Sequence, residues 1–328
     1  MAPITWLDKL ETELNVDVDW MDPEYIKSML PKIRFHDQTS NQLWVDIQLG
    51  DASNAELLKQ TAAELKDQGW LAIYTRMAVL MCKKNIDMIS GRVLLQTLPS
   101  KAYDTEFTLS HARLYDSEFR RAGISRDRFC IKIPSTGPAL NAAKILQQEG
   151  IQTLGTALFG VPQAVACSQA GCLYISPYYN ETRAHDLPEL WPNVKDPATE
   201  HPNSPRVVQI LEVYRALYKA TGKDQPLVKN ASFISPEEAM AAGEMGCHSA
   251  TISHTPLLSV DPLRADKQLQ IALDAATKVD YLADGGKALD AAIAADPAAA
   301  ERLQVALELF TGGENRSKEK IEKVLATL

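Results

Sequence analysis

The sequence predicts an α/β fold, a (β/α)8 TIM barrel with additional helices, and three observations support this prediction. Short runs rich in β-branched residues alternate with amphipathic stretches along most of the 328 residues. Several of these runs are too apolar to present a polar face, as expected of parallel strands that helices cover from outside. There are eight such runs, which is the number of strands that closes this barrel.

The eight predicted strands lie between residues typical of turns. They cover 15–18, 32–37, 92–97, 128–134, 152–159, 172–176, 226–231 and 248–253. Apolar periodicity predicts intervening helices, several with proline at an early position, at 104–122, 138–149, 162–170, 206–220 and 236–245. The long stretch 57–90 is predicted to form an extra helix over the barrel.

An open, doubly wound sheet is the alternative architecture for alternating strands and helices. It is disfavoured because no Gly-x-Gly-x-x-Gly follows the first strand and no P-loop occurs in the sequence. After Pro262 the chain is rich in alanine and contains no predicted strand. No linker rich in proline or serine precedes this part, so residues 1–328 are predicted to form one domain with a C-terminal helical extension over about 263–328.

Charge and cysteine content limit the classes of partner. The 34 Lys and Arg residues against 42 Asp and Glu give a net charge of −8, so neither nucleic acid nor a membrane surface is an expected partner. No apolar stretch approaches the roughly 18 residues of a membrane span, and no targeting signal is recognised, which predicts a cytoplasmic protein. The five cysteines form no C-x-x-C pair and are expected to be reduced thiols.

The segment FCIKIPSTG contains the first chemically informative residue, Lys132. It alternates with Ile131 and Ile133 in a strand that Pro134 ends, so it points into the barrel if the isoleucines face the helices. Burial there lowers the pKa of an amine and frees it to attack a carbonyl and form a Schiff base. A lysine that extends from the strand end into solvent is the alternative.

Polar residues at the ends of other predicted strands favour the catalytic interpretation. In this fold, catalytic side chains project from the carboxyl ends of the strands into one mouth. A carboxylate, an amide, two hydroxyls and a phenol around an amine suit a reaction at a carbon–carbon bond, because an enamine needs proton transfer around it. Individually, each has a capping or packing role as its alternative. These residues are Asp19, Gln96, Thr156, Ser176 and Tyr178.

Specific strings surround these residues: ISRDRFCIKIPSTGPALNAAKILQQEGI, ALFGVPQAVACSQAGCLYISPY and NASF. With the N-terminal LDKLETELNVDVDWMD, a YDTE string and the C-terminal SKEKIEKVL, they resemble the transaldolase family over nearly the whole chain. The resemblance implies a Schiff-base lysine at Lys132, no cofactor and a homodimer formed through the C-terminal helical part. It also implies that Asp19 is the acid/base of carbon–carbon cleavage, that Thr156 holds the catalytic water, and that Ser176 contacts the terminal hydroxyl of the donor.

Two departures from the family concern the catalytic water. Gln96 stands where transaldolases have a glutamate, and an amide orients a water but accepts no proton near neutral pH. Tyr178 stands where the family usually has phenylalanine, and its phenol is able to hold the same water. This combination resembles the fructose-6-phosphate aldolase branch, which favours simple aldol chemistry over transfer.

Other departures concern substrate binding. The two arginines with which the family holds phosphate fall at about Glu181 and at Ile234. A carboxylate at such a place repels a phosphate dianion, unless Arg183 or Lys229 reaches the site from a shifted register. Sugar phosphates are therefore expected to be poor substrates.

The two asparagines that the family places after the second and fifth strands fall near Ser40 and at Leu154. Asn41 takes the first place if the register shifts by one residue. Leu154 forms no side-chain hydrogen bond, so we expect a pocket that is less polar than a sugar site.

Together these residues predict a Schiff-base carbon–carbon lyase or transferase of transaldolase type, which acts on a small, non-phosphorylated carbonyl substrate of a specialised biosynthetic pathway. One alternative is an ordinary transaldolase that moves a dihydroxyacetone unit between sugar phosphates in the pentose phosphate pathway. Another is an inactive barrel that only binds a ligand. A metal-dependent lyase or hydrolase is disfavoured because no H-E-x-x-H or H-x-H motif occurs among its candidate ligands, His36, Asp37, His185, His248 and His254.

Overall fold

Eight parallel strands form a closed barrel in the computed structural model of the chain, which describes residues 5–253 and 278–328. The barrel closes where β8 pairs with β1, in register from Asn15 with Ser249 to Asp19 with Ser253. This closure confirms the predicted (β/α)8 TIM barrel and excludes the open sheet. The strands are β1 (Asn15–Asp19), β2 (Gln38–Thr39), β3 (Val93–Gln96), β4 (Phe129–Pro134), β5 (Thr153–Leu158), β6 (Tyr174–Pro177), β7 (Leu227–Asn230) and β8 (Ser249–Ser253).

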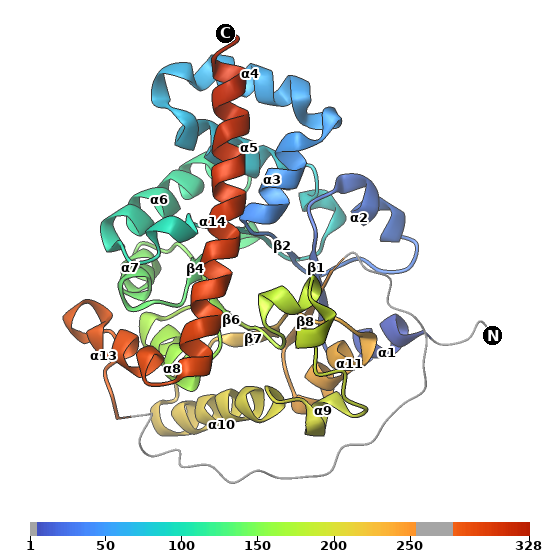
Figure 1. The fold of residues 1–328 in the computed structure, drawn as a ribbon, viewed down its shortest axis with the longest axis vertical. Coiled ribbons are helices and arrows are strands. Elements are labelled where there is room, and N and C mark those ends of the chain that lie inside the picture. The colour runs from blue at the N-terminus through green and yellow to red at the C-terminus, as the bar shows by residue number, and fades with distance from the viewer. Residues whose placement is uncertain (1–4, 254–277) are drawn as a thin grey trace.

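Helices surround the strands (Figure 1). All five predicted helices between strands are present with ends within about two residues of the prediction, as usual for helix boundaries. A glycine ends α11, because Gly246 adopts a left-handed φ of 90° after the last turn. The helices are α1 (Trp6–Glu13), α2 (Pro23–Met29), α3 (Gln42–Gly50), α4 (Ala55–Leu65), α5 (Trp70–Lys83), α6 (Thr105–Arg121), α7 (Gly137–Gln148), α8 (Val161–Ala170), α9 (Pro197–Glu200), α10 (Ser204–Thr221), α11 (Pro236–Met245), α13 (Ala283–Ala294) and α14 (Pro297–Leu325).

The prediction for the second strand was wrong. Residues 32–37 run in an irregular extended path, and the strand is the two-residue β2 that follows them. The predicted alternation exists, since Ile33 and Phe35 are buried. However, the side chain of Asp37, not a backbone carbonyl, accepts the hydrogen bond from the N–H of Arg92 at 2.6 Å, so regular pairing with β3 begins only at Gln38.

The predicted extra helix within 57–90 is two helices. The α4 helix ends at Leu65 and α5 begins at Trp70. Gly69 lies between them with a φ of 81°, a conformation that side chains rarely adopt and that breaks the helical path.

The C-terminal helix α14 crosses the carboxyl ends of the strands and packs against α3, α4 and α5 (Figure 1). Gly313 permits the close approach to α3, because a Cβ at this position would lie 2.9 Å from the backbone carbonyl of Gln42. From residue 278 onward the predicted helical extension is confirmed, whereas residues 263–277 lie outside the described part of the chain. The mouth of the barrel is thus bounded partly by a helix from the far end of the sequence.

The barrel interior is filled at its amino-terminal end. Leu94, Cys130, Leu154 and Tyr174 form an apolar cluster there, separate from the larger core between strands and helices. Open space lies towards the carboxyl ends of the strands, where catalytic residues of this fold lie. All five cysteines are buried and unpaired, as predicted. Within residues 5–253 and 278–328, none of the helices combines the length and apolarity that a membrane crossing needs.

Candidate active site

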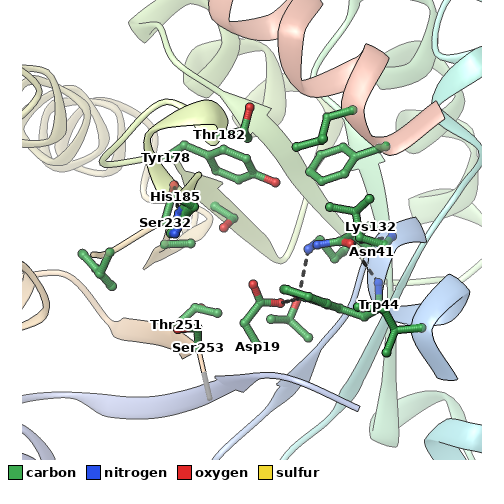
Figure 2. Close-up of a pocket in the computed structure, with 18 of the residues that line it drawn as sticks. Asp19, Asn41, Trp44, Lys132, Tyr178, Thr182, His185, Ser232, Thr251 and Ser253 are labelled. Atoms are coloured by element: carbon green, nitrogen blue, oxygen red, sulfur yellow. Dashed lines mark hydrogen bonds between the residues drawn. The ribbon is translucent and has the colours of Figure 1, made fainter. Parts of the chain in front are cut away.

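A cavity of about 450 Å³ opens at the carboxyl ends of the strands (Figure 2). Its lining combines residues of the strand ends with residues of α3, α14 and the segment after β6. The strands contribute Asp19, Thr39, Lys132, Ser176, Thr251 and Ser253. The barrel therefore brings side chains from five different strands to one site.

Lys132 lies in this cavity as the sequence predicted. Its flanking residues Ile131 and Ile133 are fully buried in the outer core, so the lysine points into the barrel. Lys132 is 4% exposed, and its amine donates a hydrogen bond of 2.9 Å to the hydroxyl of Thr39. Burial lowers the pKa of Lys132, and the charge of Asp19 only partly opposes this effect. A lowered pKa increases the fraction of neutral, nucleophilic amine.

Asp19, the last residue of β1, points into the same cavity as Lys132 (Figure 2). The indole N–H of Trp44 donates a hydrogen bond of 2.8 Å to the Oδ1 atom of Asp19. The ring of Trp44 packs edge to face against Trp20, with 4.9 Å between ring centroids. Trp44 comes from α3 and holds the carboxylate in one orientation. Sequence reasoning missed it, because a tryptophan in an amphipathic helix carries no signal of its partner.

Tyr178, which lines the cavity, and Thr156, which does not, form a hydroxyl pair. Their oxygens are 3.1 Å apart, and both residues are buried. Burial raises the pKa of Tyr178, so its phenol stays protonated and able to donate. Ala157, the next residue in β5, has a φ of 50°, and the register between β5 and β6 shifts at this point. Such local strain is found where a backbone must direct a functional side chain.

Gln96 ends β3 and lies opposite Lys132 in the register of β3 and β4. It is buried, and neither polar atom of its side chain has a hydrogen-bond partner among the described residues. An unpaired buried amide is costly, and a bound water or substrate is the usual partner of such a group. Gln96 is not among the residues that line the cavity, and its role in orienting a water stays a prediction.

The two residues near the predicted asparagine position differ in their placement. Asn41 lines the cavity and caps α3, where its side-chain oxygen accepts hydrogen bonds from the N–H groups of Leu43 and Trp44. Ser40 is fully buried, does not line the cavity, and donates to the carbonyl of Leu94 at 2.6 Å. Asn41 is thus the residue at the site.

Leu154 and Ser176 occupy different levels of the barrel. Ser176 lines the cavity, as predicted for a residue that contacts substrate. Leu154 lies deeper, in the apolar cluster at the amino-terminal end, although it pairs in register with Lys132. It therefore closes the floor of the barrel and does not line the cavity.

Neither predicted phosphate position lines the cavity. Glu181 accepts a hydrogen bond of 3.2 Å from Arg183, which also reaches Glu301 on α14 at 3.3 Å. Ile234 donates its backbone N–H to Glu238 at 2.7 Å. Arg183 is likewise absent from the lining, so it does not replace a lost arginine there.

Lys229 is the second candidate for replacing a lost arginine, and it points to the other end of the barrel. Its ammonium lies 2.9 Å from a carboxylate oxygen of Asp17 and 2.9 Å from one of Asp37. It also donates a hydrogen bond of 3.1 Å to the hydroxyl of Ser249. All three partners are buried, so Lys229 is held away from the cavity.

Sequence reasoning also missed His185 as a cavity residue, because it was weighed only as a metal ligand. His185 belongs to a short 3-10 helix, Thr182–His185, and its Nε2 atom lies 3.0 Å from the hydroxyl of Ser232. Burial lowers the pKa of His185, and the charge of Asp19 opposes this effect. The neutral imidazole adds a hydrogen-bonding group to the cavity wall.

Arg316, from α14, was the other missed lining residue of note. Its Nε atom donates a hydrogen bond of 2.7 Å to the buried carboxylate of Asp46 on α3. The same carboxylate accepts a hydrogen bond from Lys320. Arg316 and Asp46 are 270 residues apart in the sequence, so no local pattern places Arg316 at the mouth.

Three of the five candidate metal ligands lie at one end of the barrel, where the ring centroid of His248 is 6.2 Å from that of His36. His36 and Asp37 lie with Asp17 near the amino-terminal end of the barrel, and the ammonium of Lys229 already contacts both carboxylates. His185 lines the cavity at the opposite end. His254 lies outside the described residues.

A buried amine and a carboxylate that face one cavity of a closed (β/α)8 barrel are the arrangement expected of a Schiff-base aldolase. The model of the transaldolase/fructose-6-phosphate aldolase family matches residues 16–321. The chain belongs to this family.

Curated relatives agree with this assignment. A transaldolase of Nostoc punctiforme (strain ATCC 29133 / PCC 73102) is 33% identical over 262 residues, which cover 77% of this chain and 73% of that protein. A transaldolase of Gloeobacter violaceus (strain ATCC 29082 / PCC 7421) is 31% identical over 333 residues, or 98% of this chain and 81% of that protein. A transaldolase of Nostoc sp. (strain PCC 7120 / SAG 25.82 / UTEX 2576) is 28% identical over 346 residues, which cover 98% of this chain and 95% of that protein. The chain is thus an enzyme of transaldolase type with divergent sequence.

Proposed function

We propose that the enzyme catalyses aldol cleavage or addition on a non-phosphorylated carbonyl substrate, through a Schiff base on Lys132. The proposal rests on a contrast between the catalytic residues and the positions that bind phosphate in the family. The amine and its carboxylate partner Asp19 are in place, whereas the family's phosphate-binding positions, Glu181 and Ile234, hold no cation and lie outside the lining. An intermediate of a specialised biosynthetic pathway fits such a site better than a sugar phosphate does.

The reaction begins with the neutral amine of Lys132. It attacks the carbonyl carbon of a ketone, and the resulting carbinolamine loses water to give a protonated imine. In the cleavage direction, the carboxylate of Asp19 takes the proton from the hydroxyl on the β-carbon. The bond between the α- and β-carbons then breaks and an aldehyde leaves. The electron pair of the broken bond stays with the α-carbon and is held as an enamine. Addition follows the same steps in reverse.

Release of the ketone requires a proton and a water. The α-carbon of the enamine takes up the proton, which restores the imine, and water then adds to the imine carbon and expels the amine of Lys132. The hydroxyls of Thr156 and Tyr178, 3.1 Å apart, and the unpaired amide of Gln96 are the groups that we assign to hold this water. This assignment supports release of a free ketone more than its transfer to a second aldehyde.

An ordinary transaldolase, which moves a dihydroxyacetone unit between sugar phosphates, is the second candidate. One observation favours it, because the guanidinium of Arg316 lines the cavity. Arg316 already gives its Nε atom to Asp46, and it offers a phosphate one arginine where the family uses two.

A matched pair of substrates separates the two candidates. We expect the purified enzyme to cleave fructose with a kcat/KM at least equal to that for fructose 6-phosphate, because no arginine pair offsets the cost of taking a phosphate dianion out of water. A coupled assay of the released aldehyde measures both rates. A preference of about 100-fold or more for the phosphorylated sugar, the ratio expected from two charge-assisted contacts, would contradict the proposal. Loss of that preference in Arg316→Met would assign it to the second candidate.

A further inference from the structure

The cavity has two unlike sides. One side carries polar side chains, among them Thr182, His185 and Ser232 from the segments after β6 and β7, and Ser253 at the end of β8 (Figure 2). Hydrogen-bonding groups on that side suit a hydroxylated or carbonyl part of a substrate. The facing side is built by helices and has a different character.

Four residues from two helices form what we call the apolar wall: Leu43 and Ile47 of α3, and Leu309 and Phe310 of α14. Leu43 and Ile47 are four residues apart, so they lie on the same face of their helix. All four line the cavity, as does Trp44, and the two helices that carry them pack against each other.

The apolar wall runs from the interior to solvent. Phe310 is 3% exposed, whereas Ile47 is 45% exposed and belongs to the few large aliphatic side chains that the described surface leaves open. Since single exposed apolar residues are common, Ile47 alone has no functional meaning. Ile47 gains functional meaning because it lines the catalytic cavity together with three other apolar residues, and a ligand chain against them removes all four from water.

The two helices that carry the apolar wall are held in a fixed relation. The buried carboxylate of Asp46 on α3 accepts hydrogen bonds from Arg316 and Lys320 of α14. Gly313 lets the helix backbones approach closely, since a Cβ there would meet the backbone of Gln42 at 2.9 Å. The wall is therefore preformed, which lowers the entropic cost of binding a ligand against it.

We propose that the apolar wall is the acceptor subsite and that the aldehyde partner in the aldol reaction carries an extended alkyl or aryl chain. This inference rests on the proposed function and adds the chemical class of the second substrate. The ketone donor bonded to Lys132 occupies the polar side, and the chain of the aldehyde lies along α3 and α14 towards Ile47. Burial of each methylene then contributes to the rate of carbon–carbon bond formation.

A chain-length series tests the acceptor subsite. With dihydroxyacetone as donor, propanal, butanal, pentanal, hexanal and heptanal are compared by kcat/KM for aldol addition. One buried methylene corresponds to about a 4-fold increase, so heptanal is expected to exceed propanal by roughly two orders of magnitude. Ile47→Asn shortens the apolar wall and is expected to flatten the rise for the two longest aldehydes. The matched control is Ile145→Asn, since Ile145 is 37% exposed on α7 outside the cavity, and it should keep the full rise.

A binding measurement keeps the test independent of turnover. Unreactive n-alkanamides of the same lengths are titrated into the full-length enzyme by calorimetry, and the same rise in affinity per methylene, reduced in Ile47→Asn, is expected. Affinity and kcat/KM that do not depend on chain length would overturn the acceptor subsite. So would a preference for glyceraldehyde 3-phosphate over heptanal that disappears in Arg316→Met, because charge would then select the acceptor.

The proposed function is tested separately from the acceptor subsite. Borohydride trapping of dihydroxyacetone on Lys132, done without any aldehyde, reports only on the Schiff base. Trapping without a chain-length effect would leave the proposed function intact and reject the apolar acceptor. A chain-length effect in calorimetry without trapping would reject the Schiff base and leave an apolar binding site.

Discussion

Two buried lysines project into the same barrel, and their environments are opposite. Lys132 on β4 is 4% exposed, and Lys229 on β7 is 2% exposed. Burial lowers the pKa of Lys132, and the single charge of Asp19 offsets only part of this effect. Burial also acts against the charged form of Lys229, but two carboxylates, Asp17 and Asp37, outweigh it and raise its pKa.

The difference shows that neighbours, more than burial, decide what a lysine inside a barrel does. At the amino-terminal end, the ammonium of Lys229 also lies 4.4 Å from the centroid of the Tyr174 ring, so the cation is fully compensated and structural. At the carboxyl-terminal end, Lys132 has a hydroxyl partner, Thr39, and an open cavity. The amino-terminal end of the barrel stabilises the charged form of Lys229. The carboxyl-terminal end destabilises the charged form of Lys132, which favours its reaction as a nucleophile.

Removal of the catalytic lysine has the largest expected effect. Lys132→Ala leaves the cavity without an amine that can form an imine, so we expect kcat/KM to fall by about 10⁴-fold or more. The steady-state rate with the best donor and acceptor measures this loss. The circular dichroism spectrum and the urea midpoint should stay close to those of the wild type. The substitution removes a buried amine that lacks a full counter-charge, so no fully compensated ion pair is lost. A residual rate within 10-fold of the wild type would assign the nucleophile to another residue.

Removal of the structural lysine should affect stability first. Lys229→Met leaves Asp17 and Asp37 buried without their counter-ion, which is expected to cost about 3–5 kcal/mol in the free energy of unfolding. Urea denaturation measures this quantity. The triple variant that adds Asp17→Asn and Asp37→Asn removes the unpaired charges and should recover much of the loss. An unchanged free energy of unfolding in Lys229→Met would mean that the ion pairs are not essential to the barrel.

Trp44→Phe separates formation of the imine from cleavage of the carbon–carbon bond. The substitution keeps a ring against Trp20 but removes the N–H that donates to Asp19, so we expect kcat to fall by about 10- to 100-fold, the effect of one hydrogen bond to a charged group. Imine trapping on Lys132 should stay unchanged. Trp70→Phe, which lies outside the cavity, is the matched control. Equal losses of trapping and turnover would show that Trp44 only supports the fold.

The pH dependence of stability should carry opposite signs for the two lysines. For Lys132, the native state loses its proton at a lower pH than the unfolded chain, so stability rises with pH between the lowered pKa and the ordinary value of 10.5. For Lys229, whose pKa is raised, the contribution to stability is full below pH 10.5 and is lost above it. Comparing the wild type with Lys132→Met by urea denaturation from pH 7 to 10 measures the first slope, at most about 1.4 kcal/mol per pH unit. Identical slopes would mean that Lys132 is charged in the native protein.

The residues that the strands carry could be predicted from the sequence, because local periodicity reveals the strands. Alternation with two isoleucines placed Lys132 in the interior, and strand ends located Asp19, Thr156 and Ser176. The two-residue β2 was missed because two polar residues, Gln38 and Thr39, have no period to detect. Hydrogen bonding there depends on the side chain of Asp37, which is a tertiary contact.

The side of the cavity that α3 and α14 form could not be predicted from sequence patterns, because it also depends on tertiary contacts. The periodicity of α14 indicates which of its faces is buried, but not that this face crosses the mouth of the barrel. Arg316 and Phe310 therefore read as ordinary helix residues, and Trp44 as a core residue of α3. Only the close packing of α14 against α3 brings these three side chains to the cavity.

The most direct test of the account is borohydride reduction in the presence of dihydroxyacetone, hydroxyacetone, pyruvate, fructose or fructose 6-phosphate, read by peptide mass spectrometry. Reduction converts an imine into a stable amine on the lysine that formed it. We predict an adduct of donor mass on Lys132, none on Lys229, none in Lys132→Ala, and the strongest labelling with an unphosphorylated donor. An adduct on a different lysine, or no adduct with any donor on the folded enzyme, would contradict the assignment of Lys132 as the Schiff-base residue.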